Sequence, residues 1–372
     1  MQEIIEGKAI LKIPEIKKVS KKMPVFYNPA MSLNRDISIL LLKSIKQKKL
    51  QIADLMAGTG IRTARFLLEL SASKIKLLAT NDANPKFKKS ISKLLKQNKI
   101  STKKVVITSE DANKFLLNSA GFDYIEIDPF GSPNPYLDCA IKRLSRKGIL
   151  AVTATDTSAL AGSHENACKR KYWAKPLRNE LMHEVGIRIL ARKVQLIGAQ
   201  YEKTLIPIFS HSTEHYMRIY FACTKGKRQV DEIIKQHTFM MFCNNCRNSF
   251  ISKQNKAKCQ NCQQEMQYSG PIWAGQLWDA QLTQKMLKLS SGNVKQLIEI
   301  IAQESKINIV GFYSLSKLCH FLKRAVPKKT ELIMQIKKIN YEASPTHFAG
   351  DAIKTSIPIN ELLLLIENFE KL

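Results

Sequence analysis

The chain has 372 residues, a length that predicts two domains rather than one. Its hydrophobic content of 44% and aromatic content of 8% are those of a globular protein, so general disorder is excluded. The 59 Lys and Arg residues against 31 Asp and Glu residues give a formal net charge of +28, spread along the whole chain. This excess predicts a polyanionic partner, although a lysine-rich solvated surface would give the same numbers.

The sequence does not indicate a membrane protein or a secreted protein. The chain lacks a run of about 18 apolar residues, the length that a membrane-spanning helix needs. Its first ten residues, MQEIIEGKAI, show no basic-then-apolar signal. We therefore expect a soluble, cytoplasmic protein that does not bind membranes.

Short apolar runs alternate with longer amphipathic runs between residues 50 and 225. This pattern predicts strands at residues 51–55, 74–82, 105–112, 123–130 and 148–156, and helices at residues 61–70, 85–97 and 177–194. Repeated strand–helix units predict an α/β fold with a mostly parallel sheet covered by helices. Strands 204–212 and 215–224 follow each other closely and predict an antiparallel hairpin that closes the sheet. Such a sheet resembles the Rossmann-like methyltransferase domain more than a dehydrogenase.

Acidic residues follow the first three predicted strands at their carboxyl ends: Asp54, Asp82 and Asp111. Asp54 begins the loop DLMAGTGIR, in which Gly58 and Gly60 let the backbone pass close to a ligand. Thr63 stands where a dinucleotide fingerprint has its third glycine, which disfavours an NAD site. Open α/β sheets bind ligands at this edge, and an acid placed like Asp82 can bind ribose hydroxyls. The sequence therefore predicts a nucleoside-containing ligand there.

The segment DYIEIDPFGSP, residues 123–133, places Asp128 at the end of the fourth predicted strand. Its Asp-Pro-Phe-Gly resembles the (D/N/S)-P-P-(Y/F) motif of methyltransferases that act on exocyclic amines. The lone pair of such an amine is delocalised into its ring, and a carboxylate that accepts an N–H bond keeps electron density on the nitrogen and can take its proton. Phe130 can stack on a flat base. The alternative is a simple turn, which Asp and Pro commonly form.

Five segments together resemble the tRNA (guanine-26, N2)-dimethyltransferase family over nearly the full chain. They are MPVFYNPAMSLNRD (23–36), DLMAGTGIRTARF (54–66), DPFGSP (128–133), VTATDTSALAGSHENACKRKY (152–172) and SPTHFAGDAIKTSIP (344–358). The resemblance implies S-adenosyl-L-methionine as cofactor and tRNA as substrate. It further implies that the exocyclic N2 of guanine 26 receives one methyl group and then a second.

The resemblance also implies which residues form the site. Asp128 is the expected catalytic carboxylate, and Phe26 and Phe130 are expected to sandwich the flipped guanine. With the glycine loop included, the expected cofactor-binding residues are Arg35, Asp54, Gly58, Gly60, Arg62 or Arg65, Asp82, Asp111 and Ala112. The sequence does not decide between the two arginines of the helix.

The eight cysteines divide into four scattered residues and one tight group in CNNC and CQNC, residues 243–246 and 259–262. Two C-x2-C pairs at this spacing predict a tetrahedral site for one Zn²⁺. Its expected ligands are Cys243, Cys246, Cys259 and Cys262. Four thiolates leave no open ligand position, so the zinc is expected to be structural; four unpaired thiols are the alternative.

Residues 313–324 and 327–339 predict two short basic helices, followed by an extended, turn-containing run to residue 358. Helix, helix, hairpin resembles a winged helix and predicts tRNA binding, while a domain that merely packs is the alternative. We therefore expect a methyltransferase domain with an N-terminal extension (1–237), a zinc ribbon (238–270) and a smaller α+β tRNA-binding domain (271–372). A chain with its own RNA-binding domain is expected to be a monomer.

Two other functions fit the same residues. One is methylation of the amine of another tRNA guanine, of ribosomal RNA or of adenine in DNA, which Asp-Pro-Phe-Gly also suits. The other is a non-catalytic RNA-binding protein whose sheet keeps a nucleotide pocket. Such a binding module would have no reason to hold S-adenosyl-L-methionine.

Overall fold

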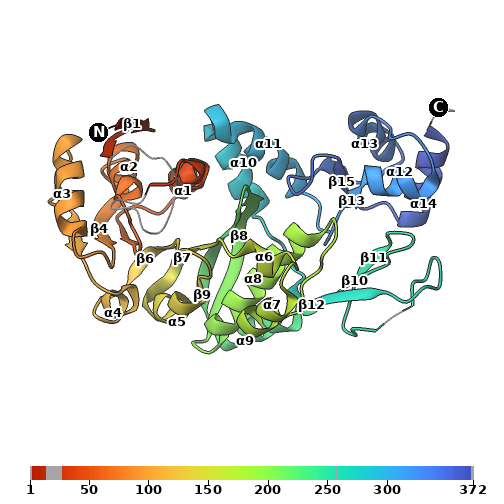
Figure 1. Ribbon diagram of the computed structural model, residues 1–372, viewed down its shortest axis with the longest axis horizontal. Coiled ribbons are helices and arrows are strands. Elements are labelled where there is room, and N and C mark those ends of the chain that lie inside the picture. The colour runs from red at the N-terminus through yellow and green to blue at the C-terminus, as the bar shows by residue number, and fades with distance from the viewer. Residues whose placement is uncertain (1, 14–26, 257, 370–372) are drawn as a thin grey trace.

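The computed structural model describes residues 2–13, 27–256 and 258–369 (Figure 1). The strands are β1 (Gln2–Glu6), β2 (Ala9–Ile13), β3 (Leu50–Asp54), β4 (Ile75–Asn81), β5 (Val105–Thr108), β6 (Phe122–Ile127), β7 (Leu144–Ala154), β8 (Lys203–Thr213), β9 (Tyr216–Lys225), β10 (His237–Phe242), β11 (Ser249–Ser252), β12 (Gln267–Trp273), β13 (Tyr313–Ser314), β14 (Ala343–Pro345) and β15 (Ala352–Thr355). The helices are α1 (Ser32–Ser44), α2 (Ile61–Glu69), α3 (Phe87–Gln97), α4 (Ala112–Leu117), α5 (Asn134–Arg143), α6 (Thr157–Leu160), α7 (Glu165–Tyr172), α8 (Met182–Ala199), α9 (Lys227–Lys235), α10 (Ala280–Leu289), α11 (Lys295–Glu304), α12 (Leu315–Leu322), α13 (Lys329–Lys338) and α14 (Ile359–Glu367).

A seven-stranded sheet in the order β5-β4-β3-β6-β7-β9-β8 forms the centre of the molecule. The strands from β5 to β7 pair in parallel, and β9 runs antiparallel between β7 and β8. The predicted parallel sheet and its closing hairpin are thus confirmed. The strand order changes direction between β3 and β6, and open α/β sheets bind ligands at such a point.

The central strands are apolar because helices cover the sheet. Ile52, Ile125 and Leu150 are fully buried in one large hydrophobic core, as expected for strands without a solvated face. The same core continues past the sheet to Trp273 of β12 and Ile298 of α11. The domain limits proposed above therefore stay predictions.

Several predicted element boundaries differ from the structure. β5 ends at Thr108, so the prediction that Asp111 ends a strand is wrong. The Asp111 carboxylate instead caps α4. It accepts hydrogen bonds from the backbone N–H of Asn113 at 2.9 Å and of Lys114 at 3.0 Å. An Asp that satisfies such N–H groups is strongly favoured at a helix start. Pro85 likewise precedes α3, which begins at Phe87, and α8 begins at Met182 instead of residue 177.

Smaller sheets flank the central one. β1 and β2 form an N-terminal hairpin that the sequence analysis did not predict, and β10 pairs antiparallel with both β11 and β12. β14 and β15 follow α12 and α13, which is the predicted order of helix, helix and hairpin, and β13 adds a third strand. These C-terminal elements have a separate apolar core and lie at the opposite end of the molecule from α3 (Figure 1).

Among residues 2–13, 27–256 and 258–369, no helix is both long and apolar enough to cross a bilayer.

Candidate active site and metal centre

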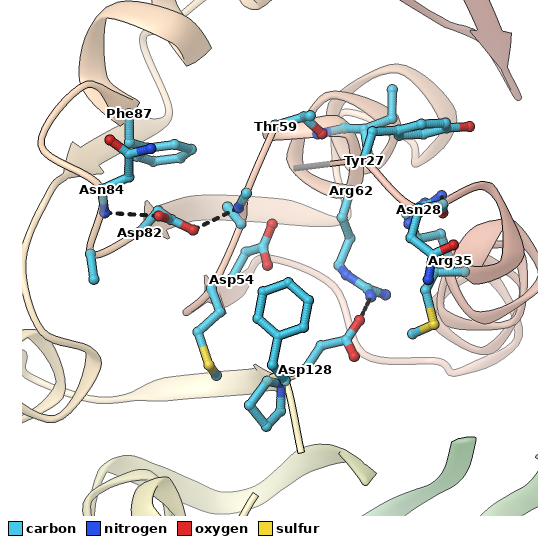
Figure 2. Close-up of a pocket in the computed structure, with 18 of the residues that line it drawn as sticks. Tyr27, Asn28, Arg35, Asp54, Thr59, Arg62, Asp82, Asn84, Phe87 and Asp128 are labelled. Carbon is cyan, nitrogen blue, oxygen red and sulfur yellow. Dashed lines mark hydrogen bonds and ion pairs between the residues drawn. The ribbon is translucent and has the colours of Figure 1, made fainter. Parts of the chain in front are cut away.

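A cavity of about 530 Å³ lies at the carboxyl ends of β3, β4 and β6, where the strand order changes direction. Figure 2 shows the residues that converge on it from the sheet edge and from α1 and α2. Of the predicted site residues, those that line the cavity are Arg35, Asp54, Gly58, Arg62, Asp82, Asp128 and Phe130. The sheet edge therefore brings together most of the residues that the sequence placed there.

Four other predicted residues lie elsewhere, and one lies outside the described residues. Gly60 is the N-cap of α2 and is not one of the residues that line the cavity, and Arg65 forms an ion pair with Glu6. Asp111 caps α4, and Ala112 is buried at the start of that helix. Phe26 belongs to the segment that the structure does not describe, so its stacking role stays a prediction.

Asp82 holds the loop between β3 and α2. Its carboxylate accepts bonds from the backbone N–H of Gly58 at 2.8 Å and of Asn84 at 2.9 Å (Figure 2). Gly58 and Gly60 have positive φ angles of 57° and 80°, a conformation that favours glycine. A side chain at Gly60 would also meet Ile91 at 2.7 Å. The loop is thus fixed close to the cavity by its own glycines and by a neighbouring strand end.

Asp54 is a buried carboxyl group in the cavity wall. It ends β3, is 2% exposed, and accepts a hydrogen bond from the Thr63 hydroxyl at 2.8 Å. Burial raises the pKa of Asp54 to about 6, and the nearby Glu126 carboxylate adds to this effect while Arg62 opposes it. A carboxyl group that ionises so close to neutrality suits a cationic ligand, because the ligand's charge would favour the ionised form.

Asp128 and Phe130 lie on the loop that follows β6. The strand ends at Ile127, so Asp128 is the first loop residue and points into the cavity, while the Phe130 side chain is 48% exposed. The next residue, Gly131, has a φ of 84° and is clamped to the end of β7. Its N–H donates to the Thr155 hydroxyl at 2.6 Å, and its carbonyl accepts the Thr155 N–H at 2.9 Å. The loop is therefore held at Gly131 to the residue that follows β7.

Two buried charges that the sequence analysis missed lie behind Asp128. Glu126 of β6 and Arg218 of β9 form a two-pronged ion pair at 2.6 and 2.8 Å. Burial would raise the pKa of Glu126, but Arg218 and Arg62 outweigh it and hold that pKa below its usual value. A charged residue with apolar neighbours in each of two largely apolar strands, Glu126 in β6 and Arg218 in β9, is the signal that could have revealed this pair, since buried charges need partners.

A second charged cluster, centred on Glu6, contains Arg65 but not Arg62. Glu6 of β1 accepts bonds from Arg35 Nε and Nη2, each at 2.6 Å, and from Arg65 Nη1 at 2.8 Å. The Tyr27 hydroxyl donates to the same carboxylate at 2.9 Å. Arg62 lines the cavity and Arg65 does not. Which of the two contacts the cofactor stays open at this point.

The four clustered cysteines come together at one end of the β10-β11-β12 sheet. Their sulfur atoms all lie within 4.8 Å of one another, which is the spacing of a candidate metal centre. The two C-x2-C turns repeat the same backbone bonds, because Cys243 N donates to Asn248 O and Cys259 N to Gln264 O, each at 2.8 Å. The predicted cluster of four thiols is thus present as one compact group.

Comparison with known proteins shows to which family the chain belongs. Residues 7–367 match the family model described as N2,N2-dimethylguanosine tRNA methyltransferase. The chain belongs to this family. The family predicted from the sequence motifs is thereby confirmed.

Relatives and a solved structure match over the full length. The tRNA (guanine(26)-N(2)/guanine(27)-N(2))-dimethyltransferase of Aquifex aeolicus is 38% identical over 99% of this chain and 96% of its own. The tRNA (guanine(26)-N(2))-dimethyltransferase of Methanobrevibacter smithii is 36% identical over 99% of this chain and 97% of its own. The structure of Trm1 from Pyrococcus horikoshii with S-adenosyl-L-methionine matches with a TM-score of 0.87 and 33% identity, covering 98% of this chain and 100% of that chain.

Proposed function

We propose that the protein transfers methyl groups from S-adenosyl-L-methionine to the exocyclic N2 of guanine 26 in tRNA, first one and then a second. The observation that carries this proposal is the position of Asp128. It lies in the cavity at the point where the strand order changes direction, in a chain whose full-length relatives are named for this reaction.

The cavity suits S-adenosyl-L-methionine in size and charge. Its volume of about 530 Å³ falls in the usual range for small-molecule sites. Asp54, Asp82 and Asp128 offer carboxylates to a ligand with sulfonium and ammonium groups, and Phe87 offers an apolar face for adenine. Arg35, oriented by Glu6, is our candidate for the cofactor's carboxylate. When bound, the cofactor supplies an electrophilic methyl group.

Asp128 and Phe130 then act on the base. The guanine has to leave its stack to reach the cavity, which costs a few kcal/mol and is offset by stacking on aromatic side chains. Phe130, which lines the cavity, is the proposed ring on one face of the base, and Phe26 is the proposed ring on the other face. Asp128 accepts an N–H bond from N2, keeps electron density on that nitrogen and takes the proton that it releases.

We also propose that the four cysteines hold one Zn²⁺. Four thiolates at this spacing suit zinc, and they leave no position open for a substrate. The ion would therefore hold the two C-x2-C turns together and take no part in methyl transfer.

The C-terminal elements are the proposed tRNA-binding part. Residues 271–372 include α12 and α13, and the last turn of α13 carries Lys337 and Lys338 on its exposed surface. Together with the net charge of +28, they suit a phosphate backbone. We expect the enzyme to act as a cytoplasmic monomer.

One relative supports a second candidate reaction. The Aquifex aeolicus protein, 38% identical to this chain, is named for guanine 27 as well as guanine 26. Methylation of both guanines is therefore the candidate to test beside methylation of guanine 26 alone.

Methyl transfer to tRNA transcripts tests these proposals. The purified protein is incubated with labelled S-adenosyl-L-methionine and with transcripts that carry guanine or adenine at positions 26 and 27. We expect label in the unaltered transcript and none when adenine replaces guanine 26. Label that persists in that transcript but is lost when guanine 27 is also replaced would favour the second candidate. Equal labelling of all the transcripts would overturn both.

A further inference from the structure

Arg62 connects the cavity to the buried charges beneath it. Its guanidinium forms an ion pair with Asp128 Oδ2 (Figure 2), and its Nη1 lies 3.5 Å from Glu126 Oε2. The side chain is 5% exposed even though it lines the cavity. A guanidinium buried this deeply takes its orientation from its protein partners.

Helix α1 holds the other side of this guanidinium. Both Nη atoms of Arg62 donate to Asn34 Oδ1 at 3.0 Å, and Nη1 also donates to the Ser38 hydroxyl at 3.0 Å. Ser38 is itself fixed, because it accepts a bond from Arg218 Nη2 at 2.9 Å. The guanidinium of Arg62 thus contacts α1 and β6 directly and is linked to β9 through Ser38. Turning Arg62 toward a cofactor would break several buried hydrogen bonds at once.

We propose that Arg62 is a positioning residue that acts through Asp128 and that it is not a cofactor contact. The inference rests on the function proposed above. With Oδ2 held by Arg62, Oδ1 is the oxygen presented to N2 of the flipped guanine. As the N–CH₃ bond forms, the S–CH₃ bond breaks, its electron pair stays on sulfur, and the N2 proton passes to Asp128.

The same geometry serves both methyl transfers. Guanine N2 carries two N–H groups before the first transfer and one before the second. A single fixed acceptor oxygen can take one N–H in each case, with the other substituent directed away from Asp128. N2,N2-dimethylguanine has no N–H left on N2, so the product loses this contact between N2 and Asp128.

A double-mutant cycle between Arg62 and Asp128 tests the proposal. Single-turnover methylation with saturating tRNA and cofactor is measured for Arg62→Gln, Asp128→Asn and the double variant, and cofactor Kd is measured by calorimetry. We expect Arg62→Gln to slow the reaction by about 10²-fold while cofactor Kd stays within about twofold. The double variant should be about as slow as Asp128→Asn alone, because residues that act as a unit are not additive.

Two further variants keep the test valid if Arg62→Gln folds poorly. Arg62→Lys keeps the charge but cannot reach Asn34 and Asp128 together, and Asn34→Ala removes the anchor while keeping the arginine. We expect each to slow single turnover by roughly tenfold with cofactor Kd unchanged. Arg188→Gln is the matched control, because Arg188 is equally buried but pairs with Glu184 away from the cavity. It should lower Tm and leave the single-turnover rate unchanged.

The possible results separate this inference from the proposed function. A wild-type protein that leaves tRNA unmethylated overturns the proposed function and the inference together. If the wild type is active, the inference alone is overturned when Arg62→Gln raises the cofactor Kd tenfold or more and keeps a normal single-turnover rate. The inference is also overturned if the double variant is slowed by the product of the two single effects. A normal single-turnover rate in both Arg62→Lys and Asn34→Ala would overturn it as well.

Discussion

At the scale of single residues, Asp128 is held as a reacting group would be, by a guanidinium on one side and a clamped loop on the other. We expect Asp128→Asn to lower turnover by about 10²-fold or more, because Asn keeps the shape but loses the charge and the proton acceptor. Cofactor and tRNA affinities should change little. The rate is measured in single turnover with cofactor saturating. Near-normal activity would make Asp128 a turn residue, since Asn forms the same turn.

Asp54 predicts a pH dependence of stability. Its pKa in the folded protein, about 6, lies above the ordinary value of 3.8, so the folded state binds the proton more tightly than the unfolded state does. The charged carboxylate therefore lowers stability as the pH rises from about 4 to about 6, by an amount on the order of 2–3 kcal/mol.

The variant Asp54→Asn should remove this pH dependence. Urea unfolding is measured for both proteins at pH 4 and pH 7. We expect the wild type to lose stability relative to the variant over that interval. Parallel stability curves would show that Asp54 ionises normally and that its burial has no such effect.

At the scale of elements, the cysteine cluster lies on two connections: Cys243 and Cys246 follow β10, and Cys259 and Cys262 precede β12. We expect one Zn²⁺ per chain by atomic absorption, and Cys243→Ser should lower Tm and tRNA affinity more than cofactor affinity. A loss of about 2 kcal/mol would lower Tm by roughly 2–3 °C in a chain of 372 residues. Cys168→Ser is the control, since Cys168 is buried away from the cluster. A metal-free protein that melts like the wild type would contradict the zinc proposal.

The elements also show what the sequence could predict. Apolar runs gave the central strands, and Asp54, Asp82 and Asp128 could be grouped because parallel strands end at one edge. The choice between Arg62 and Arg65 could not be made. They lie three residues apart on one helix. The partners of Arg62 come from β6 and the loop after it, and Glu6, a partner of Arg65, comes from β1, and no local pattern connects these segments.

Long-range pairs were missed for the same reason. Glu126 and Arg218 are 92 positions apart, and each is a fully buried charge with apolar neighbours in its strand. Hydrophobic periodicity predicts that such strands are buried but does not say which charges meet inside. Asp111 was assigned wrongly for a local reason. An acidic residue between a strand and a helix can end the strand or cap the helix, and only the hydrogen bonds of its carboxylate distinguish the two.

At the scale of the whole molecule, the net charge of +28 predicts that tRNA affinity falls steeply with salt. Lys337 and Lys338 of α13 lie at the opposite end of the molecule from α3 (Figure 1). We expect the double change to Glu at these positions to weaken tRNA binding by about tenfold or more and to reduce the salt slope. Cofactor Kd should not change.

The matched control places the same charge change on α3, at the exposed Lys89 and Lys93. Filter binding of tRNA at several salt concentrations compares the two double variants. A larger loss for α13 supports a tRNA-binding surface in the C-terminal part. Equal losses would mean that the lysines act only through total charge.

The most direct test of the proposed methylation of guanine 26 is mass spectrometry. It is applied to nucleosides and nuclease fragments from one tRNA transcript incubated with the protein and S-adenosyl-L-methionine. We predict N2-methylguanosine at early times and N2,N2-dimethylguanosine at late times, both in the fragment that contains position 26. Methylation of a different atom or a different base, or a transcript that stays unmodified while the cofactor is bound, would contradict the proposed reaction.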